Sequence, residues 1–206
     1  MSAIALARAE RIDLANLLAG LTPEQWDAPS LCTQWRVRDV VAHMIGYEDL
    51  SGTEFFPRVV RGGFNPNRIN ANRLAELANR TPEQLLAMVR ASETPRSLTS
   101  GFGCRIALLD GIVHQQDIRR PLGIPREIPG ERMRVAMDFA RWAPPVRGAL
   151  RARGVRLVAT DLDWSRGRGP EVTGPAEALL MAMAARPCVL ADLDGPGKST
   201  LAQHIS

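Results

Sequence analysis

Apolar residues that repeat at helical spacing constrain the fold of this chain more than any other feature. The clearest stripe begins near Trp35 and consists of Val37, Val40, Val41, Met44, Ile45 and Glu48. Its i, i+3, i+4, i+7 spacing predicts a helix with one buried face. We predict further helices over residues 2–19, 22–26, 67–92, 104–120, 131–142 and 174–185. So many helical segments indicate a mostly α-helical core.

Capping residues mark several of the expected helix ends. Thr22-Pro23 and Thr81-Pro82 each place a threonine where it can cap a helix and a proline at the first helical position. Gly20 and Gly123 stand where helices are expected to end. The pattern therefore predicts a break within residues 67–92, at Thr81.

After about residue 150 the pattern changes from helical to mixed. Residues 155–160 and 171–173 are rich in β-branched and apolar side chains, which predicts two strands with a turn at 167–169, and residues 188–190 suggest a last strand. We predict a helical domain over 1–148 and a small α/β domain over 149–206. The expected fold class is mostly α: a four-helix bundle followed by a C-terminal α/β appendage.

The charged residues argue against several classes of partner. Lysine and arginine number 26 against 22 aspartate and glutamate, and the basic residues are spread along the chain. An unclustered net charge of +4 without a DNA- or RNA-binding motif argues against a nucleic-acid partner. No stretch approaches the roughly 20 apolar residues of a membrane span. The charged, amphipathic N-terminal segment also argues against a secretory signal, so we expect a cytoplasmic protein.

The three cysteines form no recognisable pair. Cys32, Cys104 and Cys188 are widely separated and make no C-x-x-C motif, so each is expected to be a small buried hydrophobe. No cysteine stands one helical turn from a histidine, which leaves a Cys–His nucleophile without local support. A G-x-S-x-G elbow, which would indicate a serine hydrolase, is also missing from the sequence.

Two histidines and an aspartate could hold a metal ion. Asp110 and His114 stand four residues apart, so both side chains lie on one face of the predicted helix over 104–120. His43, from an earlier helix, could complete a two-histidine, one-carboxylate site with positions open to water or substrate. The alternative is a structural histidine bonded to a neighbouring acid. Asp117, on the same face, could orient a ligand or pair with an arginine.

The C-terminal segment Gly195 to Thr200 imitates a phosphate-binding loop. The first glycine of that motif would fall on Asp192, and no clear helix is expected to follow, so we predict that this segment binds no nucleotide. His204, in the same tail, is expected to be exposed to solvent.

With these residues in view, the chain resembles the actinobacterial, maleylpyruvate isomerase-like family of mycothiol-dependent enzymes, within the DinB-like superfamily. The resemblance rests on six segments: residues 21–26, 29–32, 35–43, 113–119, 122–123 and 169–176. It covers nearly the whole chain. The element W-x-V-R-D-x-x-x-H, which runs from Trp35 to His43, is its most specific part.

The resemblance implies a DinB-like four-helix bundle that holds a divalent metal, typically zinc. His43 matches the first ligand of the family and His114 the third. Asp110 stands where the family has glutamate, so its reach is shorter by one methylene group. In the family, a low-molecular-weight thiol is thought to bind the metal as its thiolate and to attack an electrophile.

The expected function is therefore a metal- and mycothiol-dependent transferase or isomerase that acts on a small electrophile. One alternative is a non-catalytic metal-binding or stress-response protein on the same bundle. Another is a metal-free helical protein in which Asp110 only pairs with an arginine. We expect a small thiol and a small electrophile as partners, and a homodimer is left open.

Overall fold

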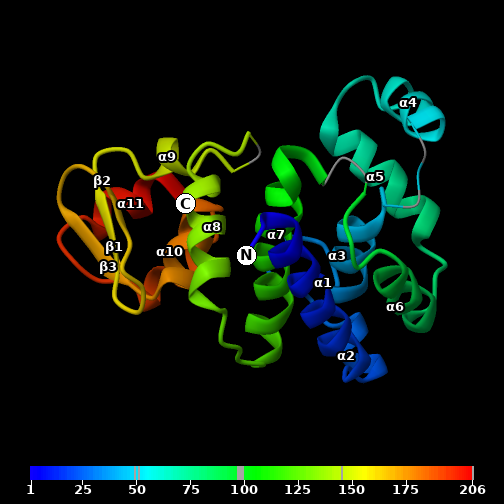
Figure 1. The fold of residues 1–206 in the computed structure, drawn as a ribbon, viewed down its shortest axis with the longest axis horizontal. Coiled ribbons are helices and arrows are strands. Elements are labelled where there is room, and N and C mark those ends of the chain that lie inside the picture. The colour runs from blue at the N-terminus through cyan, green and yellow to red at the C-terminus, as the bar shows by residue number, and fades with distance from the viewer. Residues whose placement is uncertain (49, 51, 97–99, 145, 206) are drawn as a thin grey trace. The chain divides into compact units, whose positions relative to one another are not determined.

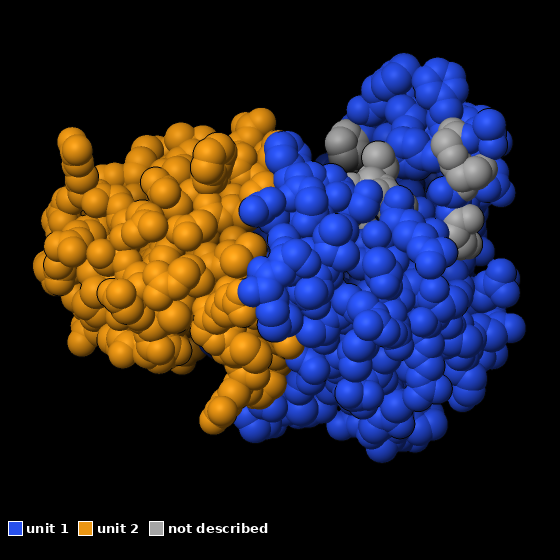
Figure 2. All heavy atoms as spheres, viewed as in Figure 1, with its two compact units in different colours: residues 1–125 blue, residues 126–206 orange. Residues whose placement is uncertain are grey.

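The computed structural model describes residues 1–48, 50, 52–96, 100–144 and 146–205, and their elements are shown in Figure 1. The chain divides into two compact units, Met1–Pro125 and Arg126–Ser206, which are coloured separately in Figure 2. The predicted domain boundary after residue 148 lies inside the second unit. Helix α8 (Gly130–Ala140) belongs to that unit because it packs against α10 (Ala176–Met183).

The first unit is a set of packed helices. It contains α1 (Ala3–Ala19), α2 (Pro23–Asp27), α3 (Val37–Ile45), α4 (Gly52–Arg61), α5 (Pro66–Leu77), α6 (Pro82–Ala91) and α7 (Gly101–Leu122). Helix α1 packs against α6 and α7, and α3 packs against the same two helices (Figure 1). Leu14, Val40 and Ile118 come from three of these helices and are fully buried in one apolar core. This arrangement holds α3 beside α7.

The predicted helix boundaries follow from local chemistry. Thr22 and Thr81 each form a capping box with the glutamine three residues later, and the break between α5 and α6 falls at Thr81 as predicted. Gly123 ends α7 with a φ of 64°, a left-handed conformation that glycine adopts without steric cost. Helix α4, which contains Pro57, was not predicted.

The N-terminal end of α7 departs from regular helix. Phe102, Gly103 and Cys104 have φ values of 54°, 66° and 67°. Non-glycine residues are rare in this left-handed region. Regular helix therefore begins after Cys104, close to the predicted start, and the turn that carries Asp110 and His114 lies within it.

The second unit combines helices with a small sheet. Besides α8 and α10 it contains α9 (Gly148–Arg151), β1 (Arg156–Ala159), β2 (Ser165–Gly167), β3 (Glu171–Gly174), the 3-10 helix η2 (Pro187–Asp192) and α11 (Lys198–Ile205). The strand order is β2-β1-β3, with β1 antiparallel to β2 and parallel to β3. The strands predicted at 155–160 and 171–173 are present, and β2 was not predicted.

The strand predicted at residues 188–190 is wrong. Pro187 opens η2 there, and proline lacks the N–H that an inner strand must donate to its neighbour. The predicted fold class, mostly helical with a small C-terminal α/β appendage, is confirmed. Among the described residues, the helices are too short or too polar for any of them to cross a lipid bilayer.

Candidate metal centre

The structure brings His43, Asp110 and His114 together. One ligand atom from each residue lies within 4.8 Å of the other two. The Nε2 atom of His114 is 3.4 Å from Oδ1 of Asp110, and the two imidazole rings meet edge to face with centroids 5.1 Å apart. Ligand atoms about 2.0–2.1 Å from a tetrahedral zinc ion would lie roughly 3.4 Å from one another. Two imidazoles and a carboxylate at these distances therefore fit a divalent transition metal.

Helix packing produces this arrangement. Asp110 and His114 share one face of α7 because they are four residues apart, and His43 comes from α3, which packs on α7. The Trp35 ring contacts His43 with centroids 5.1 Å apart. The Asp110 side chain is 29% exposed, so this carboxylate is in contact with solvent.

Asp117 orients His114, which was one of its two predicted roles. Its Oδ2 lies 2.8 Å from Nδ1 of His114, and the aspartate is fully buried. The natural assignment is that Nδ1–H donates to the carboxylate, so that Nε2 faces Asp110 and offers a lone pair there once its proton is lost. Metal-binding histidines commonly donate their second ring N–H to a carboxylate in this way.

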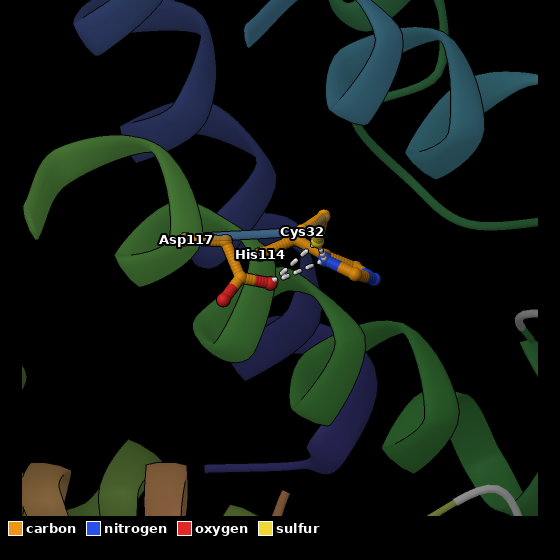
Figure 3. A group of neighbouring side chains, drawn as sticks. All are labelled: Cys32, His114 and Asp117. Carbon is orange, nitrogen blue, oxygen red and sulfur yellow. Dashed lines mark hydrogen bonds and ion pairs between the residues drawn. The ribbon is translucent and has the colours of Figure 1, made fainter. Parts of the chain in front are cut away.

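Cys32 also lies at this site, which the sequence analysis missed. Figure 3 shows its sulfur beside His114 and Asp117: Sγ is 3.2 Å from Oδ2 of Asp117 and 3.8 Å from Nδ1 of His114. The expectation that each cysteine is a buried hydrophobe holds for Cys104 but is wrong for half-buried Cys32 and exposed Cys188. Helical register was the wrong test, because Cys32 lies in the loop before α3. The available signal was that Cys32 ends segment 29–32 of the family resemblance, just before the segment that begins at Trp35.

The charges of the metal-free site are strongly coupled. Burial by itself would raise the pKa of Asp110, but the charge and hydrogen bond of His114 lower it to about 2. Burial by itself would lower the pKa of His114, but Asp110 and Asp117 hold it well above its usual 6.5. Without a metal, the pair is therefore a carboxylate and an imidazolium at neutral pH, and a cation must displace a proton from His114.

A buried ion pair lies near these residues. Nη2 of Arg11 is 3.2 Å from Oε1 of Glu48, and the two side chains are 4% and 3% exposed. The charge of Arg11 contributes to the lowered pKa of Asp110. Nothing in the sequence distinguished Arg11 from the other charged residues of α1. Its burial depends on how α1 packs against α6 and α7.

The glycine-rich loop over residues 195–200 and His204, which the sequence analysis also considered, lie in the second unit. A helix does follow the glycine-rich loop, contrary to expectation, but the amides of the loop are already used: Gly195 N donates to Asp194 Oδ1, and Gly197 N donates to Glu171 O. His204 is half-buried rather than exposed. Its Nδ1 lies 3.0 Å from the carbonyl oxygen of Arg151, because α11 packs against α9.

Comparison with known proteins supports the resemblance. Residues 7–97 match the family model described as the mycothiol maleylpyruvate isomerase N-terminal domain. The matched part contains His43 but ends before α7. The family resemblance inferred from the sequence is therefore confirmed. No curated protein sequence matches the chain.

Two solved structures share the fold. A mycothiol-dependent maleylpyruvate isomerase superposes with a TM-score of 0.65 at 14% identity, over 95% of this chain and 92% of that one. A mutant of a mycothiol-dependent maleylpyruvate isomerase, with one histidine changed to alanine, superposes with a TM-score of 0.64 at 12% identity, again over 95% of this chain and 92% of that one. At these identities the likeness establishes the fold, namely a helical part followed by a C-terminal appendage.

Proposed function

We propose that this chain is a metal-dependent enzyme that uses mycothiol, or a related small thiol, to isomerise or transfer a small electrophilic substrate, as maleylpyruvate isomerases do. The observation that carries the proposal is the convergence of His43, Asp110 and His114 within 4.8 Å. The family match over residues 7–97 supplies the thiol and the reaction class.

These three residues would hold the metal, and zinc is the ion that we propose. Two neutral imidazoles and a carboxylate leave at least one position of a four-coordinate ion for an external ligand. A divalent metal there would favour the thiolate form of a bound thiol at neutral pH, and the thiolate is the nucleophilic form. Asp117 keeps Nε2 of His114 directed at the site, and the partly exposed Asp110 leaves the site accessible.

Metal content tests the ligand assignment. Protein purified without a metal-affinity tag should contain about one divalent metal per chain. His114→Ala should lose it, while His204→Ala serves as a matched control, since His204 lies in the other unit and contacts a backbone carbonyl. Full metal content in the His114→Ala protein would show that the assignment is wrong.

An activity assay distinguishes the proposed enzyme from the alternative, a non-catalytic metal-binding protein. The metal-loaded protein should convert maleylpyruvate to its trans isomer only when mycothiol is present, and His43→Ala should abolish the conversion. In the Co²⁺-substituted protein, added mycothiol should produce a sulfur-to-cobalt charge-transfer band. A protein that binds metal but shows neither the band nor turnover with this or another small electrophile would be a metal-binding protein without this chemistry.

A further inference from the structure

We propose that Cys32 is a positioning residue for His114: its S–H donates to the carboxylate oxygen of Asp117 that also accepts the imidazole N–H. On this proposal Cys32 is neither a metal ligand nor a nucleophile. The inference rests on the proposed function, because it assigns Cys32 a role toward a metal-binding histidine.

One oxygen atom receives both donors. Oδ2 of Asp117 is 2.8 Å from Nδ1 of His114 and 3.2 Å from Sγ of Cys32 (Figure 3). A carboxylate held by two donors at one oxygen has less freedom to rotate about its terminal bond than a carboxylate held by one. Asp117 is fully buried, so bulk water does not compete for that oxygen. The thiol is a weak donor, but at this position it restricts the group that orients His114.

The loop before α3 holds the thiol in place. The backbone N–H of Leu31 donates to the carbonyl oxygen of Asp117 over 3.0 Å, and the N–H of Cys32 donates to Oγ of Ser30 over 3.1 Å. Oγ of Ser30 in turn donates to the carbonyl oxygen of Trp35 over 2.8 Å. The loop is therefore bonded to the α7 backbone at the residue whose side chain Cys32 contacts.

The geometry favours positioning over metal binding. Cys32, His114 and Asp117 also have ligand atoms within 4.8 Å of one another and could in principle hold a cation. That site would require the Nδ1 lone pair of His114. An Nδ1–H that donates to Asp117 has no such lone pair, whereas Nε2 remains available on the side of His43 and Asp110.

Nuclear magnetic resonance of the metal-free protein tests this role directly. The chain has only three histidines, so their ring nitrogens can be assigned. The wild type and Cys32→Ser should show one hydrogen-bonded Nδ1–H for His114. Cys32→Ala and Cys32→Val, which lack a donor and bracket the cysteine in size, should show faster exchange of that proton. Signals for His114 that are identical in all four proteins would overturn the proposal.

Cobalt binding gives a second, independent measurement. Cys32→Ala and Cys32→Val should bind Co²⁺ about tenfold more weakly, at the low end of the effects of altered residues behind a metal ligand. Cys32→Ser should restore affinity. Cys104→Ala should leave affinity unchanged and serves as the control at a cysteine outside this cluster. Weakening that Cys32→Ser fails to restore would contradict a donor role.

A direct ligand role for Cys32 would have a different signature. A sulfur-to-cobalt charge-transfer band in the protein without added thiol, lost in Cys32→Ser, would show that Cys32 binds the metal and would overturn the proposal. A wild type that binds no Co²⁺ would refute the proposed function instead. The nuclear magnetic resonance comparison, made without metal, would still decide whether Cys32 positions His114.

Discussion

The Glu48→Gln substitution tests whether the buried ion pair between Glu48 and Arg11 stabilises the fold of the N-terminal unit. Nη2 of Arg11 lies 3.2 Å from Oε1 of Glu48, and both side chains are at least 96% buried, as their exposures of 4% and 3% show. Oε2 of Glu48 also accepts the backbone N–H of Arg96 over 3.1 Å. The amide preserves the shape of the side chain but removes the charge that balances the buried guanidinium.

The expected loss of stability is about 3 kcal/mol. Removing one partner of a buried ion pair typically costs about 3–5 kcal/mol. The lower end applies here because the amide oxygen of glutamine can still accept a hydrogen bond. For a protein of this size, about 3 kcal/mol corresponds to a fall in Tm of about 6–12 °C.

Urea and thermal unfolding of the metal-free protein, followed by circular dichroism, measure the effect. Glu93→Gln is the matched control, because its pair with Arg8 has the same chemistry at 3.3 Å but is 57% and 35% exposed. An exposed pair contributes at most about 1 kcal/mol. Arg11→Met combined with Glu48→Gln should recover much of the loss, since no buried charge then lacks its partner. A Glu48→Gln protein as stable as Glu93→Gln would refute the reasoning.

Three further predictions concern packing, pH and nucleotides. Gly111→Ala should destabilise the protein by up to about 2 kcal/mol, measured by urea unfolding, although alanine has a better helix propensity than glycine. The reason is steric, because a Cβ at position 111 would lie 2.8 Å from Cγ of buried Glu10. Unchanged stability would contradict this. In the metal-free protein, the stability contributed by His114 should be fully present below pH 6.5 and lost as pH rises through its raised pKa. The contribution of Asp110 should be present above pH 3.8 and lost as pH falls toward about 2. In urea unfolding, the difference in stability between wild type and His114→Ala should therefore shrink as pH rises through the raised pKa of His114. ATP should not bind the glycine-rich loop before α11, and a micromolar affinity lost in Lys198→Ala would show the opposite.

Local sequence patterns sufficed for features that depend on neighbours along the chain. Helical spacing identified the buried face of α3, and the threonine–proline pairs marked the starts of α2 and α6 at Thr22 and Thr81. The four-residue spacing of Asp110 and His114 placed their side chains together on α7. These features are set by backbone geometry within one helix, so one segment of sequence contains the information.

Contacts between distant segments were decided only by the tertiary structure. Cys32 and Asp117 are 85 positions apart, and no periodicity relates a loop residue to a helix residue at that separation. The same holds for Arg11 and Glu48, which are 37 positions apart and lie on α1 and beyond the end of α3. The sequence by itself thus determined which side chains share a helix face. Packing determined which faces meet, because burial and hydrogen bonding between segments depend on the whole fold.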